Sequence, residues 1–157
     1  MSGSKGPSAA YQGGCLCGAV RYAADAAPRH AHYCHCRMCQ QHFGSPFGTY
    51  VYLPTDRFRF VKGAPRHHRS SGFARRGFCA DCGSPLTFEY LQEPERLSVT
   101  IGSLDHPERV PPEQHWGIES QFAWLRIADG LPRHRTEEDP DFHRYSAGAS
   151  AVKETIE

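Results

Sequence analysis

The sequence lacks a long apolar run, an excess of charge of one sign and an apolar stretch near its N-terminus. No segment approaches the roughly 20 consecutive apolar residues that span a bilayer, so we expect no membrane partner. The net charge is +1 over 157 residues, which gives no field that would favour nucleic acid as a partner. The opening residues, MSGSKGPSAA, contain no signal-peptide core. We therefore expect a cytoplasmic protein.

The sequence is also short of apolar residues for its length. Hydrophobic residues make up 39% of the chain, and the mean hydropathy is −0.59. One domain with a thin core is the expectation for such a chain. Small domains of this kind are often stabilised by bound metal ions, which directs attention to the cysteines.

A disulfide framework does not fit the cysteine pattern. The chain has seven cysteines, an odd number, and the tight C-x-C spacing also weighs against such a framework. In a reducing compartment, thiols persist as thiols or as metal ligands. The seven fall into three groups, namely Cys15 and Cys17, then Cys34, Cys36 and Cys39, then Cys79 and Cys82.

The last group predicts a structural zinc site. Two thiolates at positions i and i+3 fit two corners of a zinc tetrahedron, and Gly83 permits the tight turn behind them. Cys79 and Cys82 need two further ligands, for which Cys15 and Cys17 are the natural donors. A rival arrangement stays open, in which the other C-x-x-C of the chain closes the site. It pairs Cys36 and Cys39 with Cys79 and Cys82 and leaves Cys15, Cys17 and Cys34 over.

The middle group, Cys34, Cys36 and Cys39, predicts an open metal site. Three protein ligands with one exchangeable position is the usual arrangement of catalytic zinc. The alternative is a closed structural site in which a histidine is the fourth ligand. His35 lies between two cysteines and is expected to point away from the metal, so His42 is the more credible candidate.

Three thiolate ligands favour one class of reaction. Together with Zn²⁺ they leave a net charge near −1, which makes the metal a poor Lewis acid. Such a site suits a fourth thiolate, from a substrate, better than hydroxide. A thiolate held there can attack a small carbonyl carbon, so we expect carbon–sulfur bond formation rather than hydrolysis. Zinc deaminases place a proline before a C-x-x-C pair, and no proline precedes Cys36 or Cys79.

Hydrophobic periodicity predicts a mainly β chain of short strands with little helix. Strands are expected at residues 31–33, 47–53, 57–61, 86–90 and 97–101, with one short helix at residues 37–43 that ends at Gly44. We expect a disordered N-terminus at residues 1–10, a zinc domain at residues 11–135 and a polar, weakly ordered tail at residues 136–157.

Aromatic and arginine side chains are candidates for a binding pocket. We expect the aromatic residues to pack in the core rather than to line a pocket: these are Phe47, Tyr50, Phe88, Trp116 and Trp124. Contacts with substrate carboxylates are conceivable for several arginines, but solvated surface positions are the expectation: these are Arg66, Arg69, Arg75 and Arg76.

The order of the cysteine motifs resembles the glutathione-dependent formaldehyde-activating enzyme (GFA) family. The matching motifs are G-C-L-C-G at residues 14–18, C-H-C-R-M-C at 34–39, G-S-P-F at 44–47 and R-G-F-C-A-D-C-G-S at 76–84. His115, Glu119, Ser120 and Trp124 match the motif near the end of the domain. The resemblance covers residues 13–132.

The resemblance implies a fold, two zinc ions and an activity. The fold is of the Mss4-like (β-tent) type, built of short antiparallel strands stapled by zinc knuckles. One zinc is structural, held by Cys15, Cys17, Cys79 and Cys82. The other is catalytic, held by Cys34, Cys36 and Cys39. The family's reaction joins glutathione to formaldehyde through a zinc-bound thiolate and gives S-hydroxymethylglutathione, a carbon–sulfur lyase reaction in reverse.

Two segments depart from the family pattern. Arg37 stands where the family often has serine, and Gln121-Phe122 where it often has Lys-Ala. We expect Arg37 to offset the anionic metal centre and Gln121-Phe122 to alter a substrate wall. Another small thiol or aldehyde is therefore conceivable as substrate. The oligomeric state, a homo-oligomer included, stays open. The alternative function is a non-catalytic binding module of the same fold, against which the absence of a long basic arm speaks.

Overall fold

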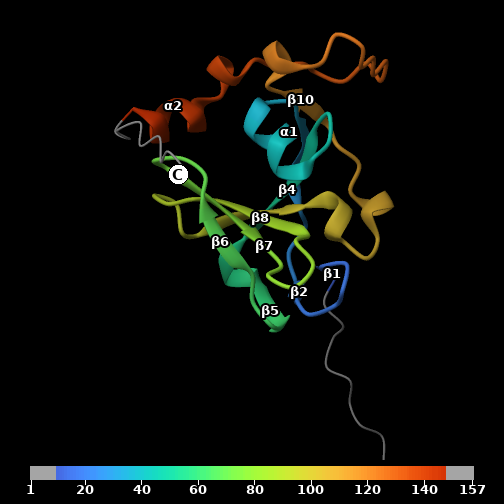
Figure 1. Ribbon diagram of the computed structural model, residues 1–157, viewed down its shortest axis with the longest axis vertical. Coiled ribbons are helices and arrows are strands. Elements are labelled where there is room, and N and C mark those ends of the chain that lie inside the picture. Colours follow the sequence, from blue (N-terminus) through green and yellow to red (C-terminus); the bar gives the residue numbers. More distant parts are fainter. Residues whose placement is uncertain (1–9, 148–157) are drawn as a thin grey trace, which may run out of the picture.

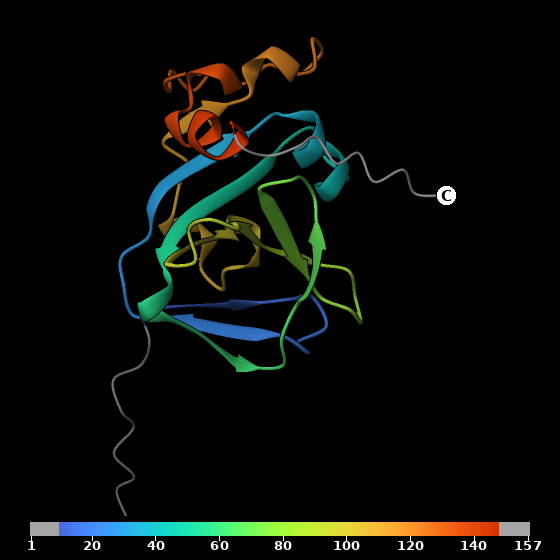
Figure 2. The same ribbon diagram turned by 90° about the vertical axis from the view of Figure 1, so that its left-hand side faces the viewer.

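The protein contains two β-sheets (Figure 1), which we describe from a computed structural model covering residues 10–147. The smaller sheet is antiparallel, in the order β1-β2-β5. Its strands are β1 (Tyr11–Gly14), β2 (Arg21–Ala24) and β5 (Phe58–Lys62). It lies at the opposite end of the molecule from the C-terminal segment (Figure 2).

The larger sheet has the order β10-β3-β4-β9-β8-β7-β6. Only the pairing of β10 with β3 is parallel, and the other pairings are antiparallel. The strands are β3 (Arg29–Cys34), β4 (Gly48–Pro54), β6 (Arg66–Arg69), β7 (Ala74–Phe78), β8 (Pro85–Tyr90), β9 (Arg96–Thr100) and β10 (Gln114–Trp116).

The two faces of the larger sheet have different surroundings. Val51 and Val99 are paired across β4 and β9, are fully buried, and pack with Tyr22 of the smaller sheet in one apolar core. Because side chains alternate across a strand, the neighbours of Val51 and Val99 along their own strands point to the other face. Arg76, paired with Phe88 across β7 and β8, belongs to this second face. This second face forms part of the wall of the cavity described below.

The helices are short. α1 (Arg37–Phe43) begins at Cys36, whose sulfur accepts a hydrogen bond from the Cys39 amide. It ends at Gly44, whose φ of 60° is the left-handed conformation that glycine adopts without strain. Single-turn 3₁₀ segments occur at Thr55–Arg57, Ile101–Ser103, Pro107–Arg109, Ile118–Ser120 and Thr136–Glu138. None of the helices in residues 10–147 has the length and apolar character needed to cross a membrane.

The predicted strands and the predicted helix agree with β3, β4, β5, β8, β9 and α1 to within one or two residues. Other strands were not predicted, among them β1, β7 and β10. The polar segment beginning at Arg66 forms β6, an edge strand with four exposed side chains. The first residues of the predicted tail contain the Thr136–Glu138 turn and α2 (Pro140–Ser146).

Aromatic contacts with the larger sheet and with the loop before β7 explain why α2 forms. Tyr145 is buried against Tyr90, with a ring-centroid distance of 4.6 Å, and Phe142 meets Phe73 edge-on at 5.9 Å. The predicted disordered N-terminus lies outside the described residues except for Ala10, as does the end of the predicted tail. The division into a domain at residues 11–135 with terminal segments stays a prediction.

Candidate functional site

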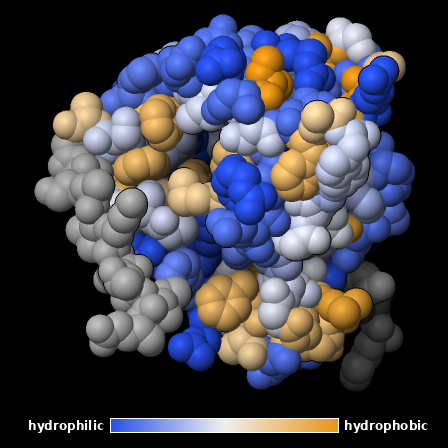
Figure 3. All heavy atoms as spheres, turned by 45° about the horizontal axis from the view of Figure 1, so that its top comes forward, coloured by the Kyte–Doolittle hydropathy of each residue, from blue (hydrophilic) through white to orange (hydrophobic). Residues whose placement is uncertain are grey.

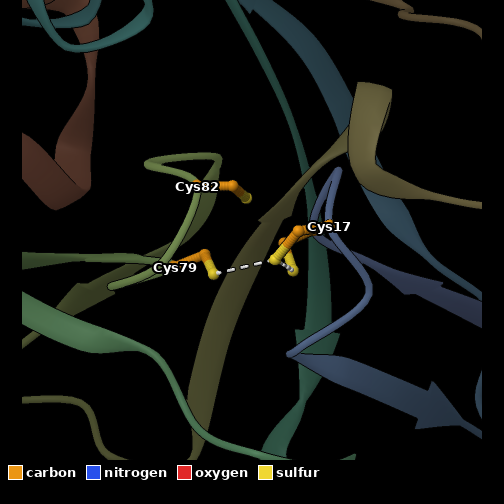
Figure 4. Close-up of side chains that lie close together, drawn as sticks. Cys17, Cys79 and Cys82 are labelled. Atoms are coloured by element: carbon orange, nitrogen blue, oxygen red, sulfur yellow. Dashed lines mark hydrogen bonds between the residues drawn. The ribbon is translucent and has the colours of Figure 1, made fainter.

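Four cysteines from the two sheets converge on one point. Cys15 and Cys17 lie in the turn between β1 and β2, and Cys79 and Cys82 lie in the turn between β7 and β8. Their four sulfur atoms lie within 4.8 Å of one another and could hold a metal ion. Figure 4 shows Cys17 facing Cys79 across the gap between the two turns. The structure therefore groups these two pairs, and not the rival combination.

The spacing of these sulfur atoms fits a tetrahedral metal rather than a disulfide. The Sγ atoms of Cys15 and Cys17 are 3.6 Å apart, and those of Cys17 and Cys79 are 3.8 Å apart. Zinc–sulfur bonds of about 2.3 Å in a tetrahedron separate the sulfurs by about 3.8 Å, whereas a disulfide bond is about 2.05 Å long. All seven cysteines are free thiols. The donor set suits zinc.

Backbone donors and a tight turn shape this four-cysteine cluster. The Val20 amide donates to the Cys15 sulfur over 3.2 Å. Gly83 has a φ of 76° and donates its amide to the Cys79 carbonyl over 2.8 Å. These are the tight turns and amide–sulfur contacts expected around a metal-binding thiolate.

Cys34, Cys36 and Cys39 form the second cluster. Cys34 ends β3, Cys36 precedes α1 and Cys39 lies in its first turn. Their sulfur atoms lie within 4.8 Å of one another and could also hold a metal ion. Among residues 10–147, no histidine or carboxylate completes this cluster. His42, the alternative fourth ligand, is not part of it. The described chain therefore offers three ligands here and not four.

His35 points away from the cluster, as expected, and belongs to a chain of hydrogen-bonded polar groups that runs from the interior to Asp129. Its Nε2 lies 2.8 Å from Nδ1 of His115, and Nε2 of His115 lies 2.8 Å from the Asp129 carboxylate. Both histidines are fully buried. The chain ties the cysteine segment to β10 and to the loop that follows it.

The backbone after β10 also packs closely on the cysteines. The amide of His35 donates to the Trp116 carbonyl over 2.8 Å. A Cβ on Gly117 would lie 2.8 Å from the backbone nitrogen of Cys36, and the φ of Gly117 is 67°. Only glycine meets both conditions without strain. The position of Cys36 thus depends on residues about 80 positions further along the chain.

A cavity of about 300 Å³ adjoins the three-cysteine cluster. Its lining includes all three cysteines and the face of the larger sheet opposite the core. Three of the candidate aromatic residues, Tyr50, Phe88 and Trp116, line it, whereas Phe47 and Trp124 do not. The expectation that these aromatic residues serve only as core is therefore wrong for three of them. Their apolar faces form much of the wall.

The C-terminal segment forms another part of the cavity wall. Thr136, Asp139, Asp141 and Phe142 all line it. α2 lies at the same end of the molecule as α1 and β10 (Figure 1). On this face, apolar residues are scattered among polar ones (Figure 3).

One of the four candidate arginines is buried beside the cysteines. Arg76 is only 4% exposed, against the expectation of a solvated position. Its Nη1 donates to the Tyr50 hydroxyl over 2.8 Å and approaches the Cys39 sulfur at 3.5 Å. Burial opposes its charge, but the nearby Tyr50 and Cys39 raise the pKa of Arg76 above its ordinary value. The guanidinium therefore stays charged.

The arrangement of the three thiols favours negative charge on Cys36. Hydrogen bonds from the thiols of Cys34 and Cys39 lower the pKa of Cys36 to about 2. The same contact with Cys36 raises the pKa of the Cys34 thiol well above its ordinary value. One thiolate is thus stabilised by its two neighbours, while burial raises the pKa of Tyr50 and keeps its hydroxyl neutral.

The two departures from the family pattern touch each other and not the cavity. The guanidinium of Arg37 lies 6.0 Å from the ring centroid of Phe122 and donates to Gln40 over 2.7 Å. Neither Arg37 nor Gln121-Phe122 lines the cavity. The expectation that Gln121-Phe122 alters a substrate wall is therefore wrong for this cavity. The expectation that Arg37 offsets the charge of the metal centre stays a prediction. The arginine that lies beside the cluster is Arg76, which approaches the Cys39 sulfur.

The model of the glutathione-dependent formaldehyde-activating enzyme family matches residues 10–120, more than half of the chain. The chain belongs to this GFA family. The match includes both cysteine clusters and ends before Asp129 and α2. The predicted family is thereby confirmed, together with the mainly β fold of short antiparallel strands that the resemblance implies.

One curated protein and one solved structure are similar to this chain. An uncharacterized lyase of Schizosaccharomyces pombe (strain 972) is 32% identical over 80 residues, which are 51% of this chain and 58% of that protein. The match thus spans less than two thirds of the relative. The crystal structure of a Rhodobacter sphaeroides protein aligns with a TM-score of 0.50 and 19% identity, over 78% of this chain and 98% of that one. This second likeness concerns the fold alone.

Proposed function

We propose that this GFA-family protein is a zinc-dependent carbon–sulfur lyase that joins a small thiol to a small aldehyde and catalyses the reverse cleavage. The observation that carries the proposal is the three-cysteine cluster, which has no fourth ligand in the described chain and borders a cavity of about 300 Å³. A closed cluster would have no position for a substrate. An open cluster facing a cavity has one.

We also propose two zinc ions per chain. Cys15, Cys17, Cys79 and Cys82 would hold a structural ion, and Cys34, Cys36 and Cys39 would hold the catalytic one. When bound by three thiolates, zinc supplies an open coordination position and keeps an arriving thiol in its nucleophilic thiolate form. Seven free thiols suit a reducing compartment such as the cytoplasm.

The proposed reaction is an addition without net oxidation or reduction. The sulfur of the thiol bonds to the carbonyl carbon of the aldehyde. The π electron pair of the carbonyl moves to its oxygen, which takes up the proton that the thiol has lost. The product is a hemithioacetal, and with glutathione and formaldehyde it is S-hydroxymethylglutathione. Cleavage of the same carbon–sulfur bond returns both reactants.

Tyr50 is our candidate for the proton donor. Its hydroxyl accepts from Arg76 over 2.8 Å, so its own proton is free for another acceptor. Because burial raises the pKa of Tyr50, the group stays neutral and can donate to the developing oxyanion. The aromatic walls of the cavity would limit access of water, which competes with the thiol for the aldehyde.

Glutathione and formaldehyde are the leading substrates because the family carries them in its name. The cavity volume of about 300 Å³ lies at the small end of the range for ligand pockets. A small adduct is therefore favoured over a bulky one.

The test is exchange NMR on the zinc-loaded protein mixed with glutathione and ¹³C-formaldehyde. Because the adduct also forms spontaneously, the measured quantity is the acceleration of exchange between free formaldehyde and adduct. We expect acceleration by the unaltered protein and by Gln41→Ala, an exposed position of α1, but none by Cys36→Ser. If the protein binds two zinc ions yet accelerates exchange with no small thiol or aldehyde, the proposal fails and a binding module is favoured.

A further inference from the structure

The charge of Arg76 has no carboxylate partner in residues 10–147. The other arginine of the cavity, Arg96, is paired with Glu93 and Asp141 at 3.1 and 2.7 Å. Arg76 contacts a thiol sulfur and a tyrosine hydroxyl instead. A buried cation needs a compensating negative charge, and the cysteine cluster is the group beside Arg76 that provides one.

The structure holds this guanidinium firmly in place. Its central carbon lies 5.0 Å from the ring centroid of Phe88, its partner across β7 and β8. The hydrogen bond to Tyr50 orients the Nη1 atom, which also approaches the Cys39 sulfur. The contact between Arg76 and the cluster is thus a fixed feature of the sheet, on the side that borders the cavity.

We propose that Arg76 is the charge partner of the three-cysteine centre and enables it to bind an external thiolate. Three thiolates around a divalent ion carry one net negative charge, which would repel a fourth thiolate. With Arg76 the group is neutral before the thiolate arrives and carries a single negative charge afterwards. Arg76 is thus a positioning residue that acts through Cys39. The inference deepens the proposed function and rests on its open metal site.

The neighbouring residue on β7 provides a matched control. Arg75 points to the other side of the strand and pairs with Glu89 at 3.1 Å. It is half-buried and lies outside the cavity lining. Replacing Arg75 removes the same chemical group from the same strand without touching the cysteines.

The test uses the full chain loaded with Co²⁺ and titrated with 2-mercaptoethanol or glutathione. Thiolate-to-cobalt charge-transfer absorption measures thiol binding directly, without any aldehyde. We expect Arg76→Met to weaken thiol binding at least about tenfold, as the loss of a partner beside a metal ligand typically does. Arg76→Lys, which keeps the charge, should restore most of the affinity, and Arg75→Met should leave it unchanged.

Two results would overturn the inference. One is an Arg76→Met protein that still holds cobalt at both clusters and binds the thiol as tightly as the unaltered protein. The other is an Arg76→Lys protein that loses as much affinity as Arg76→Met, since charge would then not be the cause. If Arg76→Met fails to fold, the lysine variant alone decides. If cobalt in the unaltered protein ignores the thiol, the proposed function fails as well.

Discussion

Tyr50 shows how one side chain gains a chemical role from its neighbours. It belongs to β4, is 3% exposed and reaches the cavity wall. Arg76 donates to its oxygen, which leaves the hydroxyl proton for a substrate. A tyrosine in the core would use that proton for a protein partner. The arrangement suits the donor of the proposed reaction.

Tyr50→Phe is therefore expected to lower kcat about 10²-fold, the usual scale for loss of a positioned proton donor. Thiol affinity should fall less than in Arg76→Met, because the charge of Arg76 and the cysteines remain although the hydrogen bond to Tyr50 is lost. Tyr11→Phe, the same change on β1 of the distant sheet, is the control and should leave kcat unaltered. Exchange NMR measures both variants. A Tyr50→Phe protein with unaltered kcat would remove this residue from the mechanism.

The sequence alone does not show which side chains, among residues of the same type, face the cavity. Arg75 and Arg76 are adjacent and chemically identical, yet one pairs with Glu89 and the other is buried beside a thiol. Which of the two faces the cavity depends on the register of β7, which no local pattern reveals. The three cysteine groups, in contrast, were visible from spacing alone, because C-x-C and C-x-x-C are rare and have few physical uses.

At the scale of elements, α2 is the main addition to the predicted fold. It lies beyond the residues that match the family and contributes Asp141 and Phe142 to the cavity wall. The sequence could not predict it, since helices shorter than about 12 residues are marginal without tertiary contacts. β6 was missed for a related reason, because an edge strand with four exposed side chains has no alternating pattern.

Asp141→Ala is expected to loosen α2, because it removes the 2.7 Å ion pair with Arg96. Hydrogen exchange should speed up at residues 140–146 while the strands keep their protection. A wider cavity should also admit bulkier thiol adducts. Asp56→Ala, which removes an exposed carboxylate from the turn before β5, is the control. Unaltered exchange in α2 would show that the aromatic contacts alone hold the helix.

At the scale of the whole molecule, the four-cysteine cluster joins the two sheets. Cys15 and Cys17 come from the smaller sheet, and Cys79 and Cys82 from the larger one. The apolar core between the sheets is modest, so a metal ion at this point would contribute directly to folding. The three-cysteine cluster lies at the end of β3 and does not connect the two sheets.

The two clusters should therefore differ in their effect on stability. We expect Cys82→Ser to unfold the protein or lower its melting temperature strongly, and Cys36→Ser to leave a folded protein with one zinc ion fewer. Thermal unfolding followed by circular dichroism, together with zinc analysis, distinguishes the two. Equal destabilisation by both substitutions would mean that both clusters are structural.

X-ray absorption at the zinc edge tests the central claim, an open three-cysteine centre, most directly. With two zinc ions per chain, four and three cysteine ligands give an average of about 3.5 sulfur atoms per zinc. Saturating glutathione should raise this average to about 4, because its thiolate occupies the open position. An average that glutathione leaves unchanged, or a single zinc ion per chain, would contradict the account.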